Sequence, residues 1–188
     1  MIIIVGFPKS GTSSFQKLFV DLGYNSYHWK KEEQYIGIMI KNNKANNKPL
    51  LNDFLDTDVI TEMNICEDEN NAYWPQIIDY EQLYNENSDS IFILNKRDPE
   101  KILSSFKRWY GYYDKLIKYS SELLDDNSDE SFIKFVINHY TNIETFFSQK
   151  PNSKFITFDI ENDNLEKLSK YIDLKNIKEF PHENKNIN

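Results

Sequence analysis

A lysine, two glycines and several hydroxyl side chains gather in one short segment near the start of the chain. The segment VGFPKSGTSSF keeps Gly6 and Gly11 at the spacing of a nucleotide-binding P-loop, G-x-x-x-x-G-K-[ST]. Thr12 stands where that loop has its lysine, and the lysine is instead Lys9. Backbone N–H groups of a glycine turn that leads into a helix bind anions. We therefore predict an anion-binding loop formed by Pro8, Lys9, Ser10, Gly11, Thr12, Ser13 and Ser14.

A second group of polar residues follows the apolar segment SIFILN. Arg97 ends this predicted strand, and Asp98 and Pro99 suit the cap and the first position of a helix. Ser105 follows eight residues after Arg97, on the second turn of that helix. Arg97 and Ser105 are therefore expected to reach one phosphate at the ligand-binding edge of a parallel sheet.

Together these motifs resemble those of the P-loop sulfotransferases, which transfer a sulfuryl group from 3′-phosphoadenosine 5′-phosphosulfate (PAPS). The segment PKSGTSS is similar to the 5′-phosphosulfate loop of that family, commonly P-K-S-G-T-T-W, and KRDPEKILSSF is similar to its 3′-phosphate motif. The resemblance implies that Lys9 and the loop bind the phosphosulfate, and that Arg97 and Ser105 bind the 3′-phosphate. It also reveals a difference, because Ser14 stands where many members carry a tryptophan that contacts the adenine.

The resemblance further implies a general base at the end of the strand that precedes the 3′-phosphate strand. In DVITEMN this position is Glu62, which we expect to accept the proton of an acceptor hydroxyl or amine. His28, in NSYHWK, is the competing candidate, either as the base or as a contact of the acceptor. Glu67 and Asp68 are further candidates. Lys9 is expected to neutralise the charge that develops on the leaving group.

The last residues of the sequence carry another motif. EFPHENKNIN resembles the F-P-H-x-N ending of some small sulfotransferases, in which a late loop returns toward the nucleotide. The resemblance implies that His182 and Lys185 contact the 3′-phosphate or the adenine, and the alternative is a frayed terminus. The late segment R-K-G-x-x-G-x-W-K of the cytosolic small-molecule branch is absent from the sequence, which is therefore more similar to the shorter, divergent members.

Aromatic side chains can serve either the core or an acceptor pocket. Helical spacing favours core packing for most of them, and the others are available to stack against a sugar or a phenol. The residues concerned are Tyr73, Trp74, Trp109, Tyr110, Tyr112 and Tyr113. His139 lies in an apolar helical pattern, so we expect no catalytic role for it.

Two other functions are compatible with parts of the sequence. A small P-loop kinase would use ATP and magnesium, but it predicts a lysine directly after Gly11, where Thr12 stands. The second alternative is a non-catalytic module that binds PAP, the product nucleotide. For sulfuryl transfer we expect no metal cofactor, because the sulfuryl group carries less negative charge than a terminal phosphoryl group.

The motifs must be positioned by strands that lead into helices. Apolar runs predict strands at residues 2–5, 25–28, 59–61, 90–97 and 155–158. Helical spacing predicts helices at 15–22, 34–41, 73–87, 98–113, 131–149 and 165–172, with a polar loop at 42–48. This alternation predicts one three-layer α/β/α domain over residues 1–188 with a central parallel sheet of about five strands. The tail from about residue 174 is expected to pack loosely.

Composition bears on partners and location. The chain has 188 residues and a net charge of −8, so we expect no nucleic-acid partner, because binding a polyanion requires clustered basic residues. Cys66 is the single cysteine, which favours a reducing, cytoplasmic location, and no apolar run is long enough to span a membrane. The expected acceptor is a small molecule, a carbohydrate or a peptide, and the oligomeric state is left open.

Overall fold

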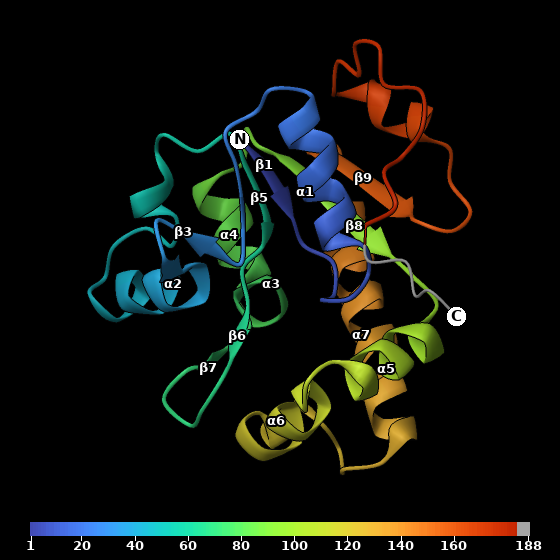
Figure 1. Ribbon diagram of the computed structural model, residues 1–188. Helices are drawn as coiled ribbons and strands as arrows, with labels where there is room; N and C mark the ends of the chain where they lie inside the picture. The colour runs from blue at the N-terminus through green and yellow to red at the C-terminus, as the bar shows by residue number, and fades with distance from the viewer. Residues whose placement is uncertain (184–188) are drawn as a thin grey trace.

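The computed structural model describes residues 1–183, in which one large sheet is covered by helices (Figure 1). The sheet has seven strands in the order β4-β3-β2-β5-β1-β8-β9. These strands are β1 (Ile2–Ile4), β2 (Ser26–His28), β3 (Lys30–Lys31), β4 (Gln34–Tyr35), β5 (Val59–Glu62), β8 (Ile91–Lys96) and β9 (Lys154–Asp159). β2, β5, β1, β8 and β9 pair in parallel, whereas β3 and β4 are antiparallel at one edge. The predicted α/β fold with a central parallel sheet of five strands is confirmed.

The remaining elements are helices and one small hairpin. The α-helices are α1 (Thr12–Asp21), α2 (Ile36–Ala45), α3 (Pro75–Ile78), α4 (Tyr80–Glu86), α5 (Pro99–Arg108), α6 (Tyr112–Tyr119) and α7 (Asp129–Ser148). Short 3₁₀ helices are η1 (Asn52–Phe54), η2 (Ser121–Leu123) and η3 (Leu165–Lys170). The hairpin pairs β6 (Ile65–Cys66) with β7 (Ala72–Tyr73).

The apolar sequence of β1 explains why helices cover both faces of the sheet. Successive residues of a strand point to opposite faces, and a continuous apolar run therefore needs a partner layer on each. Ile2 and Ile4 pack in one cluster with Phe15 of α1 and with η3. Ile3 and Val5 pack in the other cluster, with α2, α5 and α7. Two hydrophobic cores thus hold the sheet between two helical layers.

The parallel register brings the carboxyl ends of the central strands to one edge of the sheet. Ile2 of β1 pairs with Val59 of β5 and with Ile91 of β8, so these strands begin level with one another. In Figure 1, α5, α6 and the β6–β7 hairpin lie beyond the carboxyl ends of the strands. Side chains at the ends of different strands therefore converge at this edge, as is usual for ligand sites of parallel sheets.

The segment 34–48 differs from its prediction. β4 occupies the start of the predicted helix because it pairs with β3, and α2 begins only after it. α2 then continues into the predicted loop at 42–48. Asn43 accounts for this extension, since its side chain is buried and its Nδ2 donates a hydrogen bond to the carbonyl oxygen of Leu50 at 3.2 Å. Asn43 is thus a buried polar residue whose side chain is hydrogen-bonded.

The helix predicted at 73–87 is also wrong in part. Tyr73 ends β7, and α3 starts at Pro75, which lacks the N–H that a continuous helix would need. Asp79 separates α3 from α4, and its carboxylate accepts hydrogen bonds from the hydroxyl of Tyr73 and the ammonium of Lys44. Two polar contacts from outside the helix thus fix the break.

The helix predicted at 98–113 is two helices, α5 and α6. Tyr110 and Gly111, with φ of 41° and 70°, adopt left-handed backbone conformations between them. A helix cannot pass through such residues. The segment predicted as an α-helix at 165–172 is the 3₁₀ helix η3.

The described part of the tail packs beside α1. The ring of Phe180 lies 4.9 Å from that of Phe15 and 5.1 Å from that of Phe158, measured between centroids. The ammonium of Lys175 donates a hydrogen bond to the carbonyl oxygen of Leu22, at the end of α1. Within residues 1–183, no helix is both long enough and apolar enough to cross a membrane. That the chain forms a single domain stays a prediction.

Candidate active site

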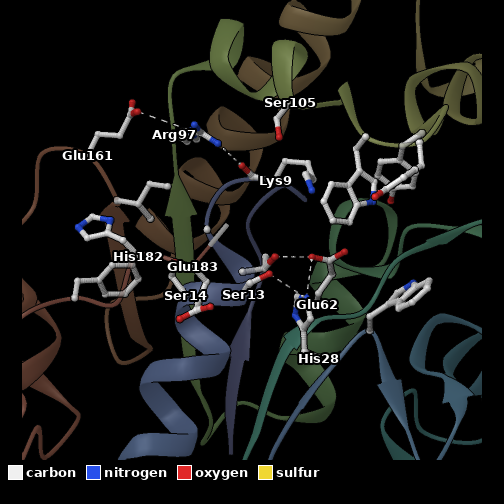
Figure 2. A pocket seen from close by; sticks show the side chains of 18 of the residues that line it. Lys9, Ser13, Ser14, His28, Glu62, Arg97, Ser105, Glu161, His182 and Glu183 are labelled. Atoms are coloured by element: carbon white, nitrogen blue, oxygen red, sulfur yellow. Dashed lines mark hydrogen bonds and ion pairs between the residues drawn. The ribbon is translucent and has the colours of Figure 1, made fainter. Parts of the chain in front are cut away.

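A cavity of about 720 Å³ lies at the carboxyl ends of the parallel strands. Figure 2 shows that its wall combines residues of the β1–α1 loop, of strand ends and of the tail. The predicted site residues that line it are Lys9, Gly11, Thr12, Ser13, Ser14, His28, Glu62, Arg97, Ser105 and His182. Pro8 and Ser10 are not among the lining residues, and Lys185 lies outside the described residues.

The loop between β1 and α1 is packed closely against neighbouring strands. Gly11 has a left-handed φ of 87°, and a Cβ atom there would lie 3.0 Å from the side chain of Ile160. A Cβ atom on Gly6 would lie 1.9 Å from Oδ1 of Asn95. Gly11 is also the N-cap of α1 and has no side chain to occupy the helix terminus. The positive end of the α1 dipole therefore faces the cavity, where it favours an anion.

Ser10 supports the loop from the protein interior. Its hydroxyl donates to the carbonyl oxygen of Phe7 and accepts a hydrogen bond from Nδ2 of Asn95 at 2.6 Å. The same amide donates to the carbonyl oxygen of Ser10 at 2.9 Å. These bonds give the Ser10 side chain a structural role, and the expected contact of the Ser10 backbone with a ligand stays a prediction.

Lys9 links the loop to the aromatic wall of the cavity. Its Nζ lies 3.5 Å from the ring centroid of Trp109, a cation–π contact. Lys9 itself has a left-handed φ of 65°, an uncommon conformation for a residue with a side chain. Burial lowers the pKa of the Lys9 ammonium, while Glu62 opposes this shift and Arg97 adds to it.

Arg97 carries an unused donor. Its Nη1 donates to the carbonyl oxygen of Lys9 at 3.0 Å, and its Nε lies 3.8 Å from a carboxylate oxygen of Glu161. That carboxylate also pairs with Nζ of Lys101 at 2.8 Å. The buried Nε of Arg97 makes no hydrogen bond within residues 1–183. An anion at this wall would supply the missing acceptor, because guanidinium groups bind phosphate with several N–H donors.

The two candidate bases lie side by side. Thr12 donates through Oγ1 to Oε2 of Glu62 at 2.5 Å, and the same oxygen lies 3.9 Å from Nε2 of His28. Nε2 of His28 also lies 3.5 Å from Oγ of Ser13. Both side chains are mostly buried, with 14% of Glu62 and 26% of His28 exposed. Strand ends and the first turn of α1 thus bring a carboxylate, an imidazole and two hydroxyls together.

An aromatic wall borders the same cavity. Trp109, Tyr110 and Tyr112 line it, whereas Tyr73 and Trp74 are buried in the core. The sequence pattern did not distinguish these groups, because the break at Gly111 that turns the first set toward the cavity was read as continuous helix. The other lining residues that sequence reasoning did not predict include Trp29, Ile160, Glu161, Phe180 and Glu183.

Glu67, a minor candidate in the sequence, also reaches the cavity. It forms an ion pair with Lys115 of α6, and this pair joins the β6–β7 hairpin to the aromatic wall. Asp68 instead accepts hydrogen bonds from the backbone of its own loop, at Asn70 and Asn71. Asp68 does not line the cavity.

The tail reaches the loop at the position where the sequence departs from the usual motif. The backbone N–H of Glu183 donates to Oγ of Ser14 at 3.0 Å, and His182 lines the cavity beside it. A large side chain at position 14 would occupy this contact. Among the residues that the structure describes, no group of three or more His, Cys, Asp or Glu side chains is arranged to hold a metal ion.

Fold and site together define an α/β protein whose first strand leads through a glycine-containing loop into a helix. Basic and acidic side chains line one cavity at this junction. The model of the sulfotransferase domain family matches residues 1–120, which is more than half of the chain, and the protein belongs to that family. The matched part includes the loop with Lys9 and the segment with Arg97 and Ser105. No curated protein matches the sequence. Family membership indicates sulfuryl transfer as the general activity.

Proposed function

We propose that this protein transfers a sulfuryl group from PAPS to an acceptor hydroxyl or amine. The observation that carries the proposal is the arrangement of one cavity: Lys9, the N-terminus of α1 and Arg97 provide positive charge, and Glu62 and His28 lie opposite as proton acceptors. A donor with two anionic ends and an acceptor that must lose a proton need this combination.

Features of the cavity fit the anionic groups of PAPS. The unused Nε of Arg97 and the hydroxyl of Ser105 would hold the 3′-phosphate. The backbone around Gly11, where a Cβ would press on Ile160, and the uncapped start of α1 would hold the 5′-phosphosulfate. PAPS, when bound, supplies the sulfuryl group.

The residues of the chain provide positioning, charge and a base. The ammonium of Lys9 places positive charge where negative charge develops on the leaving group. Glu62 accepts the proton of the acceptor, and the hydrogen bond from Thr12 fixes the position of its carboxylate. Trp109, Tyr110 and Tyr112 provide a stacking surface for the acceptor and exclude water from the reacting atoms. No step in this scheme uses a metal ion.

The proposed acceptor belongs to one of the three classes expected from the sequence. A small molecule, a carbohydrate and a peptide are all compatible with an aromatic wall that carries the Glu67–Lys115 ion pair. A cytoplasmic location is part of the proposal and rests on the single cysteine, Cys66, which is buried and unpaired.

The first test is thermal unfolding with PAP in the absence of metal, and separately with ATP and magnesium. A ligand at about 100 times its dissociation constant adds roughly 2.7 kcal/mol to the free energy of unfolding, which raises the midpoint measurably. We expect stabilisation by PAP that is lost in Arg97→Ala. The matched control is Arg108→Ala, because Arg108 is exposed and pairs only with Ser104 among its described neighbours.

Each of the other outcomes would favour a different function. Stabilisation by ATP and magnesium alone would contradict the proposal and favour a small kinase. Stabilisation by PAP together with no PAPS turnover on any class of acceptor would favour a non-catalytic PAP-binding module. If neither nucleotide raised the unfolding midpoint, the proposed PAPS-binding site would be contradicted.

A further inference from the structure

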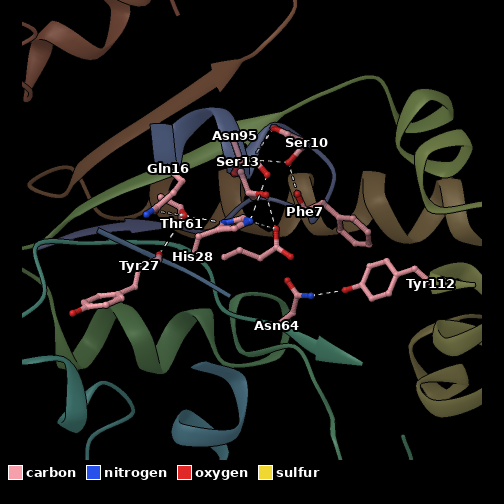
Figure 3. Close-up of polar contacts among 12 residues, drawn as sticks. Phe7, Ser10, Ser13, Gln16, Tyr27, His28, Thr61, Asn64, Asn95 and Tyr112 are labelled. Atoms are coloured by element: carbon pink, nitrogen blue, oxygen red, sulfur yellow. Dashed lines mark hydrogen bonds and ion pairs between the residues drawn. The ribbon is translucent and has the colours of Figure 1, made fainter. Parts of the chain in front are cut away.

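A chain of hydrogen bonds extends from His28 into the protein, away from the cavity (Figure 3). Nδ1 of His28 lies 3.1 Å from Oγ1 of Thr61, and that hydroxyl lies 3.1 Å from Oε1 of Gln16 and 3.3 Å from the carbonyl oxygen of Tyr27. Gln16 in turn contacts Ser26 twice. Thr61 is fully buried at the centre of this chain, and Gln16 and Ser26 are partly buried.

The direction of each hydrogen bond follows from Ser26. Its carbonyl oxygen can only accept, so the end of the Gln16 amide that lies 2.8 Å away must be the NH₂ group. Oε1 of Gln16 is therefore the end that faces Thr61, and it also accepts from the Ser26 hydroxyl at 2.6 Å. The amide orientation is thus determined by the backbone.

The Thr61 hydroxyl has one proton and two neighbours that can only accept. If its proton went to His28, its oxygen would face Oε1 of Gln16 at 3.1 Å and the carbonyl oxygen of Tyr27 at 3.3 Å with no proton between them, which is repulsive. The proton therefore goes to one of these two oxygens, and the Thr61 oxygen has only lone pairs left for His28. Nδ1 of His28 must therefore be the donor. In a neutral imidazole with a proton on Nδ1, Nε2 carries the lone pair.

We propose that Thr61, oriented by Gln16, is a positioning residue that holds neutral His28 as the Nδ1–H tautomer, so that Nε2 presents a lone pair to Glu62 and the cavity. The tautomer itself is a property of the chain alone, and its catalytic consequence rests on the proposed function. With the opposite tautomer, Nε2 would already carry a proton and could not accept another.

The consequence for transfer is a second proton acceptor. When Oε2 of Glu62 has taken the proton of the acceptor, its O–H bond breaks and a proton passes through one bridging water to Nε2 of His28, 3.9 Å away, where an N–H bond forms. The electron pair of the broken bond stays on the carboxylate, and the product is an imidazolium whose Nδ1–H still donates to Thr61. Glu62 is thereby returned to its basic form, and the imidazolium then releases its Nε2 proton to water in the cavity before the next turnover.

Nitrogen-15 NMR of the histidine rings tests the tautomer without any nucleotide or acceptor. The two neutral tautomers give different nitrogen shifts, and an alkaline spectrum, at about pH 8.5, is recorded because the neutral ring is the form to be compared. The chain has three histidines, and a His28→Gln variant identifies the signals of His28. We expect the Nδ1–H pattern for His28.

His139 provides an internal reference of the opposite kind. Its Nε2 lies 2.7 Å from the carbonyl oxygen of Val5, which can only accept, so this nitrogen must carry the proton. Burial lowers the pKa of His139 to about 4, and the ring is therefore neutral in the same spectrum. The two rings should show opposite patterns.

Two substitutions separate positioning from folding. Thr61→Val removes the hydroxyl at nearly constant volume, and we expect His28 to change to the Nε2–H pattern because Glu62 attracts that proton. We expect kcat with PAPS to fall about tenfold or more, with PAP binding unchanged, and Thr61→Ser to restore both the pattern and kcat. Thr57→Val, at a buried threonine that does not line the cavity, is the matched control.

The result that overturns the inference is an Nε2–H pattern for His28 in the unmodified chain, or an Nδ1–H pattern that survives in Thr61→Val. If Thr61→Val does not fold, the spectrum of the unmodified chain decides alone. Failure of the proposed function has a different signature, namely the expected tautomer in a protein that neither binds PAP nor transfers a sulfuryl group.

Discussion

At the scale of single residues, Lys9 joins the two parts of the cavity. Its carbonyl oxygen accepts from Arg97 on the side expected to bind the 3′-phosphate, and its ammonium lies on Trp109 at the side expected to bind the acceptor. Lys9 makes both contacts from a left-handed backbone conformation. Residues held in such conformations cluster at functional sites because the surrounding structure must support their strain.

Glu62→Gln tests the base. Glutamine keeps the size of the side chain and an oxygen that can accept from Thr12, but it cannot take a proton. We expect kcat to fall by about 10²-fold or more, with PAP binding retained, because loss of a general base typically costs that much. PAP binding measured by calorimetry beside PAP release from PAPS separates the two effects. Full turnover in Glu62→Gln would show that another group is the base.

At the scale of secondary-structure elements, the turn between α5 and α6 decides where the aromatic wall lies. Gly111 is the N-cap of α6 with φ of 70°, and a Cβ atom there would meet only Oδ2 of Asp114 at 3.9 Å. Substitution therefore strains the backbone without a steric clash. We expect Gly111→Ala to lower the free energy of unfolding by about 1 kcal/mol and Gly111→Asn by less, because asparagine tolerates this conformation.

Denaturant unfolding of both variants measures that difference. A matched glycine is Gly23, which follows α1 with φ of 88° and lies outside the cavity. Gly23→Ala should cost a similar amount and leave turnover unchanged, whereas Gly111→Ala should also lower turnover. Equal stability of the alanine and asparagine variants at position 111 would contradict the backbone explanation.

The same turn shows what could be predicted from the sequence and what could not. Strands with continuous apolar residues were predicted closely, as at 90–97, where β8 covers Ile91–Lys96. The prediction of one helix over 98–113 was wrong because the helical spacing of aromatic residues continues through Gly111. The break becomes visible only in the left-handed backbone of the structure. Local periodicity does not contain this information.

The candidate site also contains residues that could be predicted from the sequence and residues that could not. Lys9, Arg97 and Glu62 were predictable because motif positions at strand ends of a parallel sheet converge at one edge. Thr61 and Gln16 were not, since their role depends on contacts between β5, β2 and α1 that no short motif records. The inward direction of Ser10 likewise depends on Asn95, which is distant in the sequence.

At the scale of the whole molecule, His139 connects the α7 layer to the central strand region through the carbonyl oxygen of Val5. Burial lowers its pKa to about 4, whereas an unfolded chain has a histidine pKa of about 6.5. Between these values the unfolded chain binds more protons, so acidification favours unfolding. His139 alone should remove about 2 to 3 kcal/mol of stability between about pH 7.5 and about pH 4.5.

Urea unfolding at both pH values, compared with His139→Gln, measures this contribution. Glutamine keeps an N–H donor for Val5 but does not titrate, so the comparison concerns the pH dependence and not the absolute stability. We expect a smaller loss on acidification in His139→Gln. Equal losses in the two proteins would assign the acid sensitivity to other groups.

The cavity is built from residues at both ends of the described chain, since Lys9 and Ser14 line it together with Ile160, Phe180 and Glu183. A ribosome releases the loop early and the tail late, so the newly made chain has no complete wall until residue 183 has left the exit tunnel. Ligand binding across the whole cavity should accordingly be possible only in chains that have released residue 183.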